Sequence, residues 1–151
     1  MIRIRKARKQ DLHRVARLIS VTLSKVNAKY YPKRIIENLK VEYSTTGLLE
    51  KTKTRSIYVA MEKNRIVGTA SLAKDGWICA MFVSSKYQNL GVGTMLLRKL
   101  ETMAKNNGLD ILRSHVAINS VEFYKKRGFR VVKKVMFKEA GSVYRVIKKL
   151  R

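Results

Sequence analysis

Residues 88–94 (QNLGVGT) constrain the fold most, because they join an apolar run at 77–83 to an amphipathic segment at 95–107. Gly91 and Gly93 have no Cβ, so the chain can turn sharply there and bring backbone N–H groups close to a ligand. A helix that starts after this turn leaves its first four N–H groups unpaired at the positive end of its dipole. The segment therefore predicts a strand, a tight turn and a helix, with an anion site at the turn.

The spacing of the glycines excludes two common phosphate-binding motifs. The turn lacks the GxxxxGK[ST] pattern of a P-loop, and Leu96 stands where GxGxxG would need its third glycine. The remaining pattern, Gln-x-x-Gly-x-Gly, is also compatible with an ordinary strand-to-helix turn. The rest of the sequence has to distinguish the two interpretations.

Length and composition predict a single domain over residues 1–151. A chain of 151 residues that is 46% hydrophobic can bury one core and is too short to argue for two. No apolar run approaches the ~20 residues of a membrane span. The N-terminus enters strand-like sequence directly, without the apolar region of a signal peptide. We therefore expect a cytoplasmic protein without a membrane partner.

Cysteine and histidine usage argues against a metal site. The single cysteine, Cys79, lies in the apolar run and is expected to pack in the core. His13 and His115 are far apart and have no cysteines nearby at ligand spacing. No metal is expected.

The charge balance is strongly basic. With 34 Lys and Arg against 10 Asp and Glu, the formal net charge is +24. Such a field attracts polyanions, so nucleic acid, an acidic surface and a phosphorylated cofactor are all candidate partners. The basic residues are spread along the whole chain, which favours nonspecific, salt-sensitive nucleic-acid binding over specific recognition.

Periodicity predicts alternating helices and strands, and hence an α/β (α+β) domain with a mixed sheet. Asp11 is expected to cap the first helix, Pro32 to open the second, and residues 44–47 to end it. The expected strands are 2–6, 57–62, 66–72, 77–83, 109–113, 129–135 and 143–149. The expected helices are 11 to about 23, 32 to about 40, 95–107 and 120–127.

Two segments resemble motifs of one enzyme family. Residues 83–97 (VSSKYQNLGVGTMLL) resemble motif A of the GCN5-related N-acetyltransferase (GNAT) family, whose signature is Gln/Arg-x-x-Gly-x-Gly/Ala. Residues 119–129 (NSVEFYKKRGF) resemble motif B, in the right order and at a fitting distance. The resemblance implies an acyl-CoA N-acyltransferase fold with a mixed, mostly antiparallel sheet of about six to seven strands and about four helices.

The resemblance also implies acetyl-coenzyme A as the ligand. In the family its pyrophosphate lies on backbone N–H groups of the glycine turn, and the strand before motif A pairs with the pantetheine arm. Gln88 would help to close the turn, and Thr94 can add a hydroxyl. The implied cofactor-binding residues are Met81, Phe82 and Val83 in the strand, Gln88, Asn89, Leu90, Gly91, Val92, Gly93 and Thr94 in the turn, and Asn119 in motif B.

Tyr124 is the candidate general acid, because the family's Tyr-x-x-x-Gly-Phe is intact through Gly128 and Phe129. A phenol can protonate the departing thiolate. The alternative is that the Tyr124 ring simply packs on the sheet, as Phe123 is expected to do.

Asn119 has two interpretations. The family's motif-B asparagine usually lies seven residues before the tyrosine, where this chain has Ala117, while Asn119 lies five before it. A pantetheine contact is one interpretation. The more conservative one is a capping box formed with Glu122 at a helix start.

The general base is not determined by the sequence. Many relatives carry a carboxylate on the strand before motif A, but residues 77–83 contain none. Glu62, Asp75 and His115 are substitutes, and a base acting through water is equally tenable.

The acceptor is expected to be a small-molecule or peptide amine bound under residues 21–53, where Tyr30 and Tyr31 can line the cleft. A charge of +24 disfavours polyamines and lysine-rich tails, and favours neutral or acidic acceptors or a protein N-terminus on a ribosome. Two alternatives remain: an acetyl-CoA-binding sensor without catalysis, and a nucleic-acid- or ribosome-associated protein on the same scaffold. A homodimer is also left open.

Overall fold

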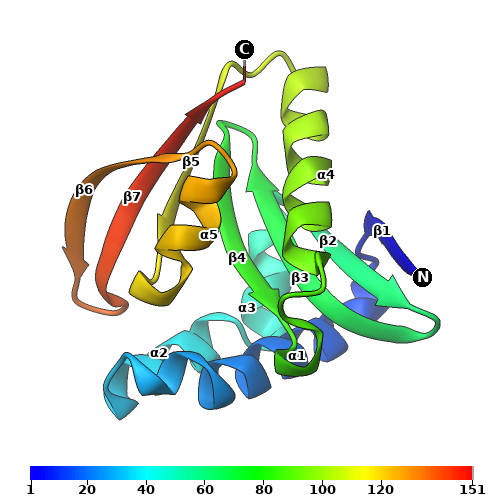
Figure 1. The fold of residues 1–151 in the computed structure, drawn as a ribbon. Coiled ribbons are helices and arrows are strands. Elements are labelled where there is room, and N and C mark those ends of the chain that lie inside the picture. Colours follow the sequence, from blue (N-terminus) through cyan, green and yellow to red (C-terminus); the bar gives the residue numbers. More distant parts are fainter. Residues whose placement is uncertain (151) are drawn as a thin grey trace.

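The computed structural model describes residues 1–150, which form one seven-stranded sheet flanked by helices (Figure 1). The strands are β1 (Ile2–Lys6), β2 (Arg55–Glu62), β3 (Arg65–Ala73), β4 (Trp77–Val83), β5 (Ile111–Val116), β6 (Arg130–Phe137) and β7 (Gly141–Lys149). The α helices are α1 (Leu12–Lys25), α2 (Lys33–Glu42), α3 (Thr45–Lys51), α4 (Val92–Asn106) and α5 (Val121–Lys126).

The sheet is mixed and mostly antiparallel, as predicted. Its strand order is β1-β2-β3-β4-β5-β7-β6, and the only parallel neighbours within residues 1–150 are β4 and β5. This parallel pair joins two antiparallel halves of the sheet. One half consists of β1 to β4, and the other of β5 to β7.

Two helices cover opposite faces of the first half-sheet. The helix α4 packs on one face of β1 to β4, and α1 packs on the other (Figure 1). This arrangement follows from the alternation of side chains along a strand: in β2, Tyr58 and Ala60 are buried in the cluster under α4, whereas Ile57 and Val59 are buried in the cluster under α1. Apolar residues at helical spacing complete both clusters, among them Leu96, Leu97 and Leu100 in α4 and Leu12, Val15 and Ile19 in α1.

Residues 44–47 were expected only to end a helix, and that expectation was incomplete. They separate α2 from a further helix, α3, that the sequence analysis did not predict. Ser44 has extended backbone angles, and its hydroxyl accepts a 3.2 Å hydrogen bond from the Gly47 N–H, as an N-cap does. The number of α helices in residues 1–150 is therefore five instead of about four.

Asp11 stands before α1 as predicted, but the expectation that its side chain caps this helix was wrong. The carboxylate accepts hydrogen bonds from the Arg8 backbone N–H at 2.7 Å and from the side chains of Arg5 and Arg14. Asp11 is only 1% exposed. The buried carboxylate accepts hydrogen bonds from two guanidinium groups instead of from the N–H groups at the start of α1, because charge-assisted hydrogen bonds are stronger.

The sheet opens between β4 and β5. These strands pair only at Trp77 with Arg113 and at Ile78 with Ser114. A register shift against β3 follows, and at this point Ala80 has a positive φ of 52°. A bulge of this kind bends a strand away from its neighbour. Beyond it, β4 and β5 diverge and leave one edge of β4 without a strand partner (Figure 1).

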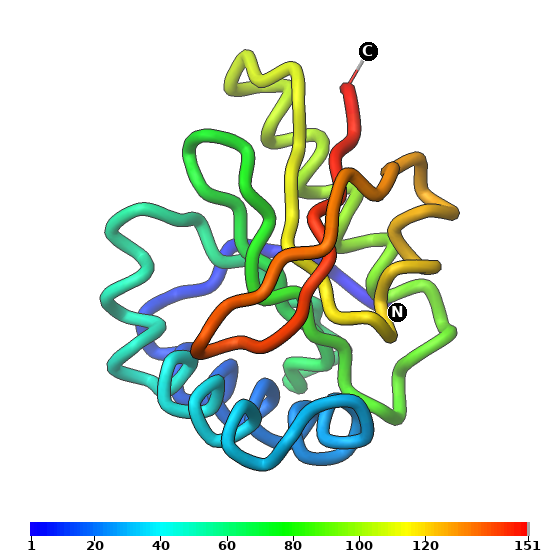
Figure 2. The backbone as a smooth tube through the Cα atoms, turned by 90° about the vertical axis from the view of Figure 1, so that its left-hand side faces the viewer, coloured from blue at the N-terminus to red at the C-terminus, as the bar shows by residue number. Residues whose placement is uncertain are grey.

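The β6–β7 hairpin reaches over to α2. The Tyr31 hydroxyl donates a 2.7 Å hydrogen bond to the Ser142 carbonyl, and Arg34 Nη1 donates to the Lys138 carbonyl at 3.3 Å. Figure 2 shows the tip of this hairpin beside the N-terminal helices. The hairpin and α2 thus close the open side of the sheet from two directions.

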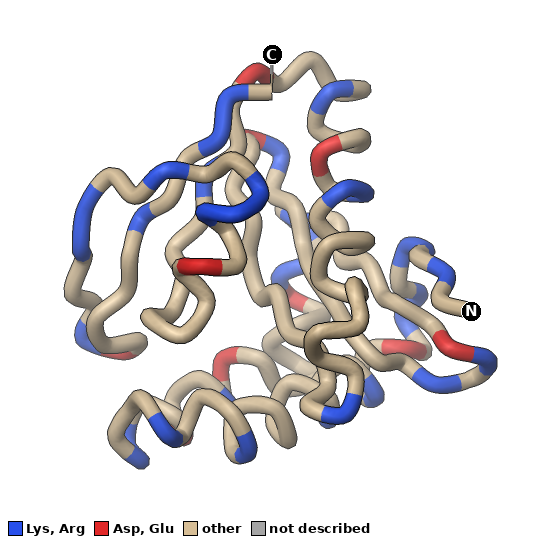
Figure 3. The backbone as a smooth tube through the Cα atoms, viewed as in Figure 1, with Lys and Arg blue, Asp and Glu red and all other residues tan. Residues whose placement is uncertain are grey.

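Lys and Arg positions are distributed along the whole backbone, as Figure 3 shows. No single arm or face collects them, in agreement with their spread along the sequence. None of the helices in residues 1–150 combines the length and apolar character that a membrane crossing requires.

Candidate active site

Two cavities meet where β4 leaves β5. One, of about 250 Å³, lies at the glycine turn and is called here the turn cavity. The other, of about 450 Å³, lies between β4, β5, α2 and the β6–β7 hairpin and is called the inner cavity. Both have the size of small-molecule sites or subsites. They share the residues Asn27, Met81, Phe82, Ser120 and Tyr124.

The glycine turn is held in an unusual backbone conformation. Asn89 and Gly91 have positive φ values of 63° and 85°. The Gln88 side chain donates from Nε2 to the Val83 carbonyl at 3.2 Å, which closes the turn onto the end of β4 as expected. A Cβ on Gly91 would have no atom within 4 Å, so this position is open for the approach of a ligand.

The start of α4 presents backbone N–H groups that no helical carbonyl can accept. The helical hydrogen bonds begin with the Met95 N–H, which donates to the Gly91 carbonyl at 3.0 Å, and no side chain caps the helix. The N–H groups of Val92, Gly93 and Thr94 are therefore available to an anion at the positive end of the helix dipole.

The turn cavity brings together nearly all of the predicted cofactor-binding residues. Leu90 alone does not line it, and its side chain is 67% exposed. The residues that do line it are Met81, Phe82, Val83, Gln88, Asn89, Gly91, Val92, Gly93, Thr94 and Asn119. Thr94 at the start of α4 and Arg127 at the end of α5 are 33 positions apart in sequence. A hydrogen bond between their side chains connects the two helices beside this cavity.

Arg127 supplies the positive charge of the turn cavity and was not predicted from the sequence. Its Nε donates a 2.7 Å hydrogen bond to Thr94 Oγ1, and its guanidinium lies 3.9 Å from the centre of the Phe123 ring. Phe123 in turn packs against Gly93, where an added Cβ would come within 3.0 Å of the ring. A signal was present in the sequence, since Arg127 directly precedes the Gly128-Phe129 pair of motif B.

Asn119 lies in a short 3₁₀ segment (Ile118–Ser120) and lines the turn cavity. The expected capping box is not formed: Ser120 is the N-cap of α5, and no side chain makes a capping hydrogen bond there. The 3₁₀ turn before α5 moves the helix start by one residue, so Asn119 points to the cavity instead of to the helix N-terminus.

Tyr124 lines both cavities and is only 2% exposed. Burial raises the pKa of the phenol, and a hydrogen bond with the Ser114 side chain opposes this rise in part. The hydroxyl therefore stays protonated across the physiological pH range. Its ring also packs edge-on against Phe123 and Phe129, so the expected packing role and a position at the cavity junction are both realised.

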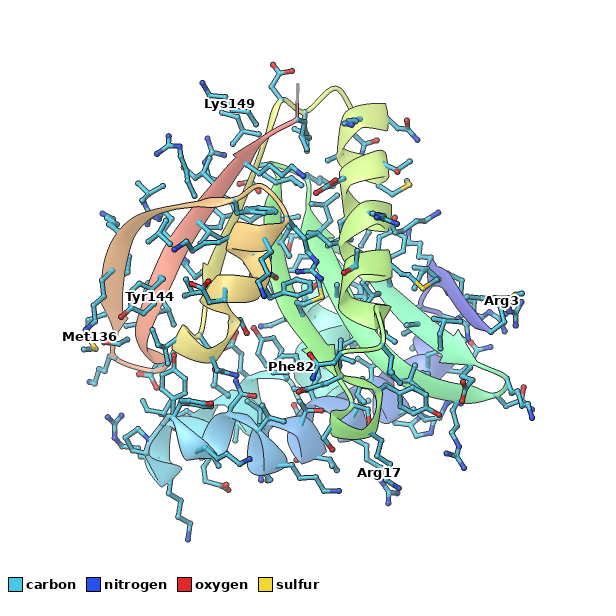
Figure 4. The ribbon with its side chains drawn as sticks, in the orientation of Figure 1. Arg3, Arg17, Phe82, Met136, Tyr144 and Lys149 are labelled. Carbon is cyan, nitrogen blue, oxygen red and sulfur yellow. The ribbon has the colours of Figure 1, made fainter. Side chains whose placement is uncertain are left out.

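The inner cavity lies where the sequence predicted the acceptor cleft. Tyr31 lines it, whereas Tyr30 is 52% exposed and does not. Phe82 and Tyr43 form part of its wall, with ring centres 6.0 Å apart. In Figure 4, Phe82 lies where β4 passes the N-terminal helices. The tip of the β6–β7 hairpin, including Phe137, forms another wall.

Cys79 is half-buried in the wall of the inner cavity, so the expectation that it belongs to the closed core was wrong. The bulge at Ala80 places it at the opening of the sheet. Burial raises the pKa of its thiol, which keeps it in the protonated, weakly nucleophilic form.

Only one of the three candidate bases lines either of these two cavities. Glu62 and Asp75 line neither cavity: Glu62 accepts a 2.5 Å hydrogen bond from the Tyr87 hydroxyl, and Asp75 is exposed in the β3–β4 turn. His115 does line the inner cavity. Burial, Arg145 and Lys133 lower its pKa, so the imidazole is neutral at pH 7. Its Nε2 accepts a 3.0 Å hydrogen bond from Arg145 Nε, which occupies the lone pair that a base would use.

Two carboxylates in the inner cavity were not predicted. Glu42 comes from the end of α2 and pairs with Lys51 at 3.5 Å, and Glu139 comes from the tip of the β6–β7 hairpin. Within residues 1–150, no group of three or more His, Cys, Asp and Glu side chains is arranged to hold a metal ion.

The geometry defines a class of protein: a mixed sheet opened between two parallel strands, with unpaired N–H groups at one side of the opening and a small-molecule cavity at the other. The chain belongs to the GNAT family of acetyltransferases. The model of the family's acetyltransferase (GNAT) domain matches residues 24–149.

Solved structures and other sequences agree with this assignment. A GCN5-related N-acetyltransferase from Rhodopseudomonas palustris superposes with a TM-score of 0.89 at 22% identity, over 97% of this chain and 94% of that one. PaiA N-acetyltransferase from Thermoplasma acidophilum, solved in complex with coenzyme A, superposes with a TM-score of 0.86 at 24% identity, over 99% of both chains. At these identities the likeness shows the fold.

Among sequences, the probable N-acetyltransferase san of Drosophila melanogaster is 28% identical over 121 residues, which are 73% of this chain and 62% of that protein. The uncharacterized protein YdhI of Bacillus subtilis is 30% identical over 90 residues, which are 57% of this chain and 56% of that protein. The match thus spans little more than half the length of these relatives.

Proposed function

We propose that the chain is an N-acetyltransferase that transfers an acetyl group from acetyl-CoA to an amine while both are bound. The observation that carries this proposal is the junction of the two cavities at the opening of the sheet, where Tyr124 lines both. An anionic cofactor entering from the turn cavity and an amine in the inner cavity would meet at this hydroxyl.

The residues of the turn cavity fit coenzyme A. The N–H groups of Val92, Gly93 and Thr94 can receive the pyrophosphate, Arg127 can balance its charge, and Gly91 leaves the approach open. The coenzyme A bound by PaiA, which has the same fold, supports this choice. The free edge of β4 beyond Ala80 offers its backbone groups to the pantetheine arm.

Bound in this way, acetyl-CoA would supply a thioester carbonyl to which the amine nitrogen adds, so that a C–N bond forms and the oxygen becomes an oxyanion; when the C=O bond reforms, the C–S bond breaks and the thiolate leaves with the electron pair. A backbone N–H of the free edge of β4 can stabilise the oxyanion that forms at this carbonyl. The Tyr124 hydroxyl donates its proton to the sulfur. Burial raises the pKa of the Tyr124 phenol, and it would raise the pKa of the coenzyme A thiol as well. Burial alone therefore does not oppose proton transfer from the phenol to the thiolate.

The amine must lose one proton in the same reaction. Glu62 and Asp75 are outside the cavities, and the His115 lone pair is occupied by Arg145. We assign this proton to water in the inner cavity, whose 450 Å³ has room for both solvent and a small acceptor. Glu42 and Glu139 in its wall can accept the proton from that water, and the same water returns a proton to the Tyr124 phenolate after the thiol has left.

A thermal shift and a turnover assay test the proposal together. Acetyl-CoA at 100 times its dissociation constant should stabilise the fold by about 2.7 kcal/mol, and dephospho-CoA and ATP serve as comparison ligands. Thiol release on a panel of amines then separates an enzyme from a sensor. A shift without thiol release would identify a sensor, and no shift with any of the three ligands would refute the proposed site.

A third cavity favours polyanion binding as a second candidate function. It has about 510 Å³ and lies under β1, α3 and the β3–β4 turn. Its charged lining is entirely basic: Lys6, Arg8, Lys9, Lys53, Arg55 and Lys74. RNA binding that weakens steeply with salt, and less steeply after substitution of these lysines, would support this function.

A further inference from the structure

One cation in the wall of the inner cavity has an unsatisfied hydrogen-bond donor. Arg55 begins β2 on the same side as Ile57 and Val59, whose side chains are buried in the cluster under α1. Its Nη1 atom is buried and has no hydrogen-bond partner. A buried donor without an acceptor costs free energy, and more so when it carries charge. The Arg55 guanidinium can therefore donate a further hydrogen bond to an acceptor on a ligand.

The neighbours of Arg55 do not supply that acceptor. The Arg55 guanidinium acts to lower the pKa of the Tyr43 hydroxyl, but its Nη1 has no hydrogen-bond partner. Glu42, a carboxylate in the same wall, is paired with Lys51 at 3.5 Å. The remaining neighbour, the Cys79 thiol, is held in its neutral form by burial.

Arg55 lines both the inner cavity and the basic third cavity, and the groups that its charge influences are on the inner side. The two side chains with which the guanidinium interacts, Tyr43 and Cys79, both line the inner cavity and neither lines the basic one. Cys79 lines the inner cavity together with Arg55 and Tyr124. One continuous cavity therefore has Tyr124 and Arg55 in its wall.

We propose that Arg55 binds a carboxylate of the acceptor, and that the acceptors are small amines that carry a carboxylate at the end opposite the reacting nitrogen. This inference rests on the proposed acetyl transfer. A guanidinium presents parallel N–H donors that match the two oxygens of a carboxylate. With the carboxylate held at Arg55, the amine is directed along the cavity toward Tyr124. A net charge of +24 draws such acceptors in and disfavours polycations.

The test compares acceptors of one backbone with and without the carboxylate. Thiol release from acetyl-CoA is measured with glycine, β-alanine, 4-aminobutanoate and 5-aminopentanoate, and with the amide of each. The proposal expects at least one acid to exceed its own amide by roughly 10-fold or more in kcat/KM, in line with the strength of charge-assisted hydrogen bonds. Equal values for every pair would overturn it.

Three variants assign the preference to Arg55. Arg55→Met removes the charge at similar length and should abolish the difference between acid and amide. Arg55→Lys keeps the charge but loses the fork, and should retain part of it. Lys74→Met removes one exposed charge from the neighbouring basic cavity and should leave the difference unchanged. A preference that survives Arg55→Met, or that disappears in Lys74→Met, would overturn the proposal.

A binding measurement separates this inference from the proposed function. Each of the four acids is titrated by calorimetry into the wild-type protein and Arg55→Met without cofactor, and circular dichroism verifies that both are folded. Binding that depends on Arg55 supports the carboxylate site even if no amine is acetylated. Turnover of amines without Arg55-dependent binding or preference supports acetyl transfer and refutes the carboxylate site.

Discussion

Arg127 Nε donates a 2.7 Å hydrogen bond to Thr94 Oγ1 and so connects α5 to the first turn of α4. The guanidinium is fixed at its other side, where Nη1 donates to the Phe123 carbonyl at 2.8 Å. Both residues line the turn cavity. The shape of the proposed pyrophosphate site therefore depends on a contact between motif A and motif B.

Arg127→Met should weaken coenzyme A binding by roughly 10-fold or more, because it removes a charge-assisted donor from the site. The free energy of unfolding should fall by about 1 kcal/mol through loss of the hydrogen bond to Thr94. Calorimetric titration and urea unfolding measure the two effects. Arg130→Met, at an exposed position outside both cavities, is the matched control, and equal coenzyme A affinities for the two variants would contradict the prediction.

Gly91→Ala and Gly108→Ala should be equally destabilising but differ in ligand binding. Both glycines have positive φ, 85° and 78°, and at both a Cβ would have no atom within 4 Å. Each substitution should cost about 1 kcal/mol of unfolding free energy. Only Gly91→Ala should weaken coenzyme A binding, since Gly108 ends α4 far from the turn. Equal affinity in both variants would show that the turn does not bind the cofactor.

Tyr124→Phe should lower kcat by roughly 100-fold or more while leaving coenzyme A affinity nearly unchanged, because it removes the proton donor and keeps the ring. Ser114 Oγ retains its 2.8 Å hydrogen bond to the Ile78 carbonyl, so the loss of stability should stay within about 1 kcal/mol. Stopped-flow or steady-state thiol release reads out kcat. Wild-type turnover by the folded variant would assign Tyr124 to packing alone.

Asp11→Asn should reduce the free energy of unfolding at pH 7 by about 3 kcal/mol, the lower end for breaking a buried ion pair, since Arg5 and Arg14 are partly exposed and can be rehydrated. Hydrogen bonds from Arg5 and from the Arg8 backbone lower the pKa of Asp11 in the folded state. Its contribution is therefore complete above the ordinary carboxyl pKa near 4 and is lost as the pH falls toward the lower, folded value.

The difference between wild-type protein and Asp11→Asn should accordingly shrink when urea unfolding is repeated between pH 5 and pH 2. Glu37, whose exposed carboxylate pairs with the half-buried Lys40 within α2, provides the control: Glu37→Gln should change stability by less than about 1 kcal/mol at any of these pH values. A pH-independent difference for Asp11→Asn would contradict the assigned ion pair.

Local patterns were sufficient for most elements of the fold. The strand expected at 77–83 has these bounds in the structure, and α4 begins at Val92, three residues before the expected start. The fifth strand was placed too early, at 109–113, because Leu109 is apolar. Its N–H instead completes the end of α4 by donating to the Ala104 carbonyl at 3.0 Å, and β5 runs from Ile111 to Val116.

The opening of the sheet could not be derived from local sequence. An alanine with φ near 52° is strained, and nothing in the apolar run around Ala80 marks the bulge. The surrounding pairing with β3 imposes it. Only the family resemblance indicated a splayed strand.

The composition of the inner cavity was also beyond sequence reasoning. Glu62 and Asp75 are close in sequence to β4, yet Glu42, from the end of a helix, is the carboxylate that reaches the cavity. The segment that leads into α2 is fixed to the β6–β7 hairpin by the hydrogen bond from Tyr31 to Ser142. Contacts across more than 100 residues set this arrangement, and no short motif encodes them.

The diverging segment of β4 forms a common wall of the turn cavity and the inner cavity through Met81 and Phe82. A ligand that orders this wall from one side changes the free energy of binding on the other. Such coupling is reciprocal: the factor by which coenzyme A changes acceptor affinity equals the factor by which the acceptor changes coenzyme A affinity. The coupling between coenzyme A and the acceptor, and the order in which they bind, can therefore be measured and traced to this segment of β4.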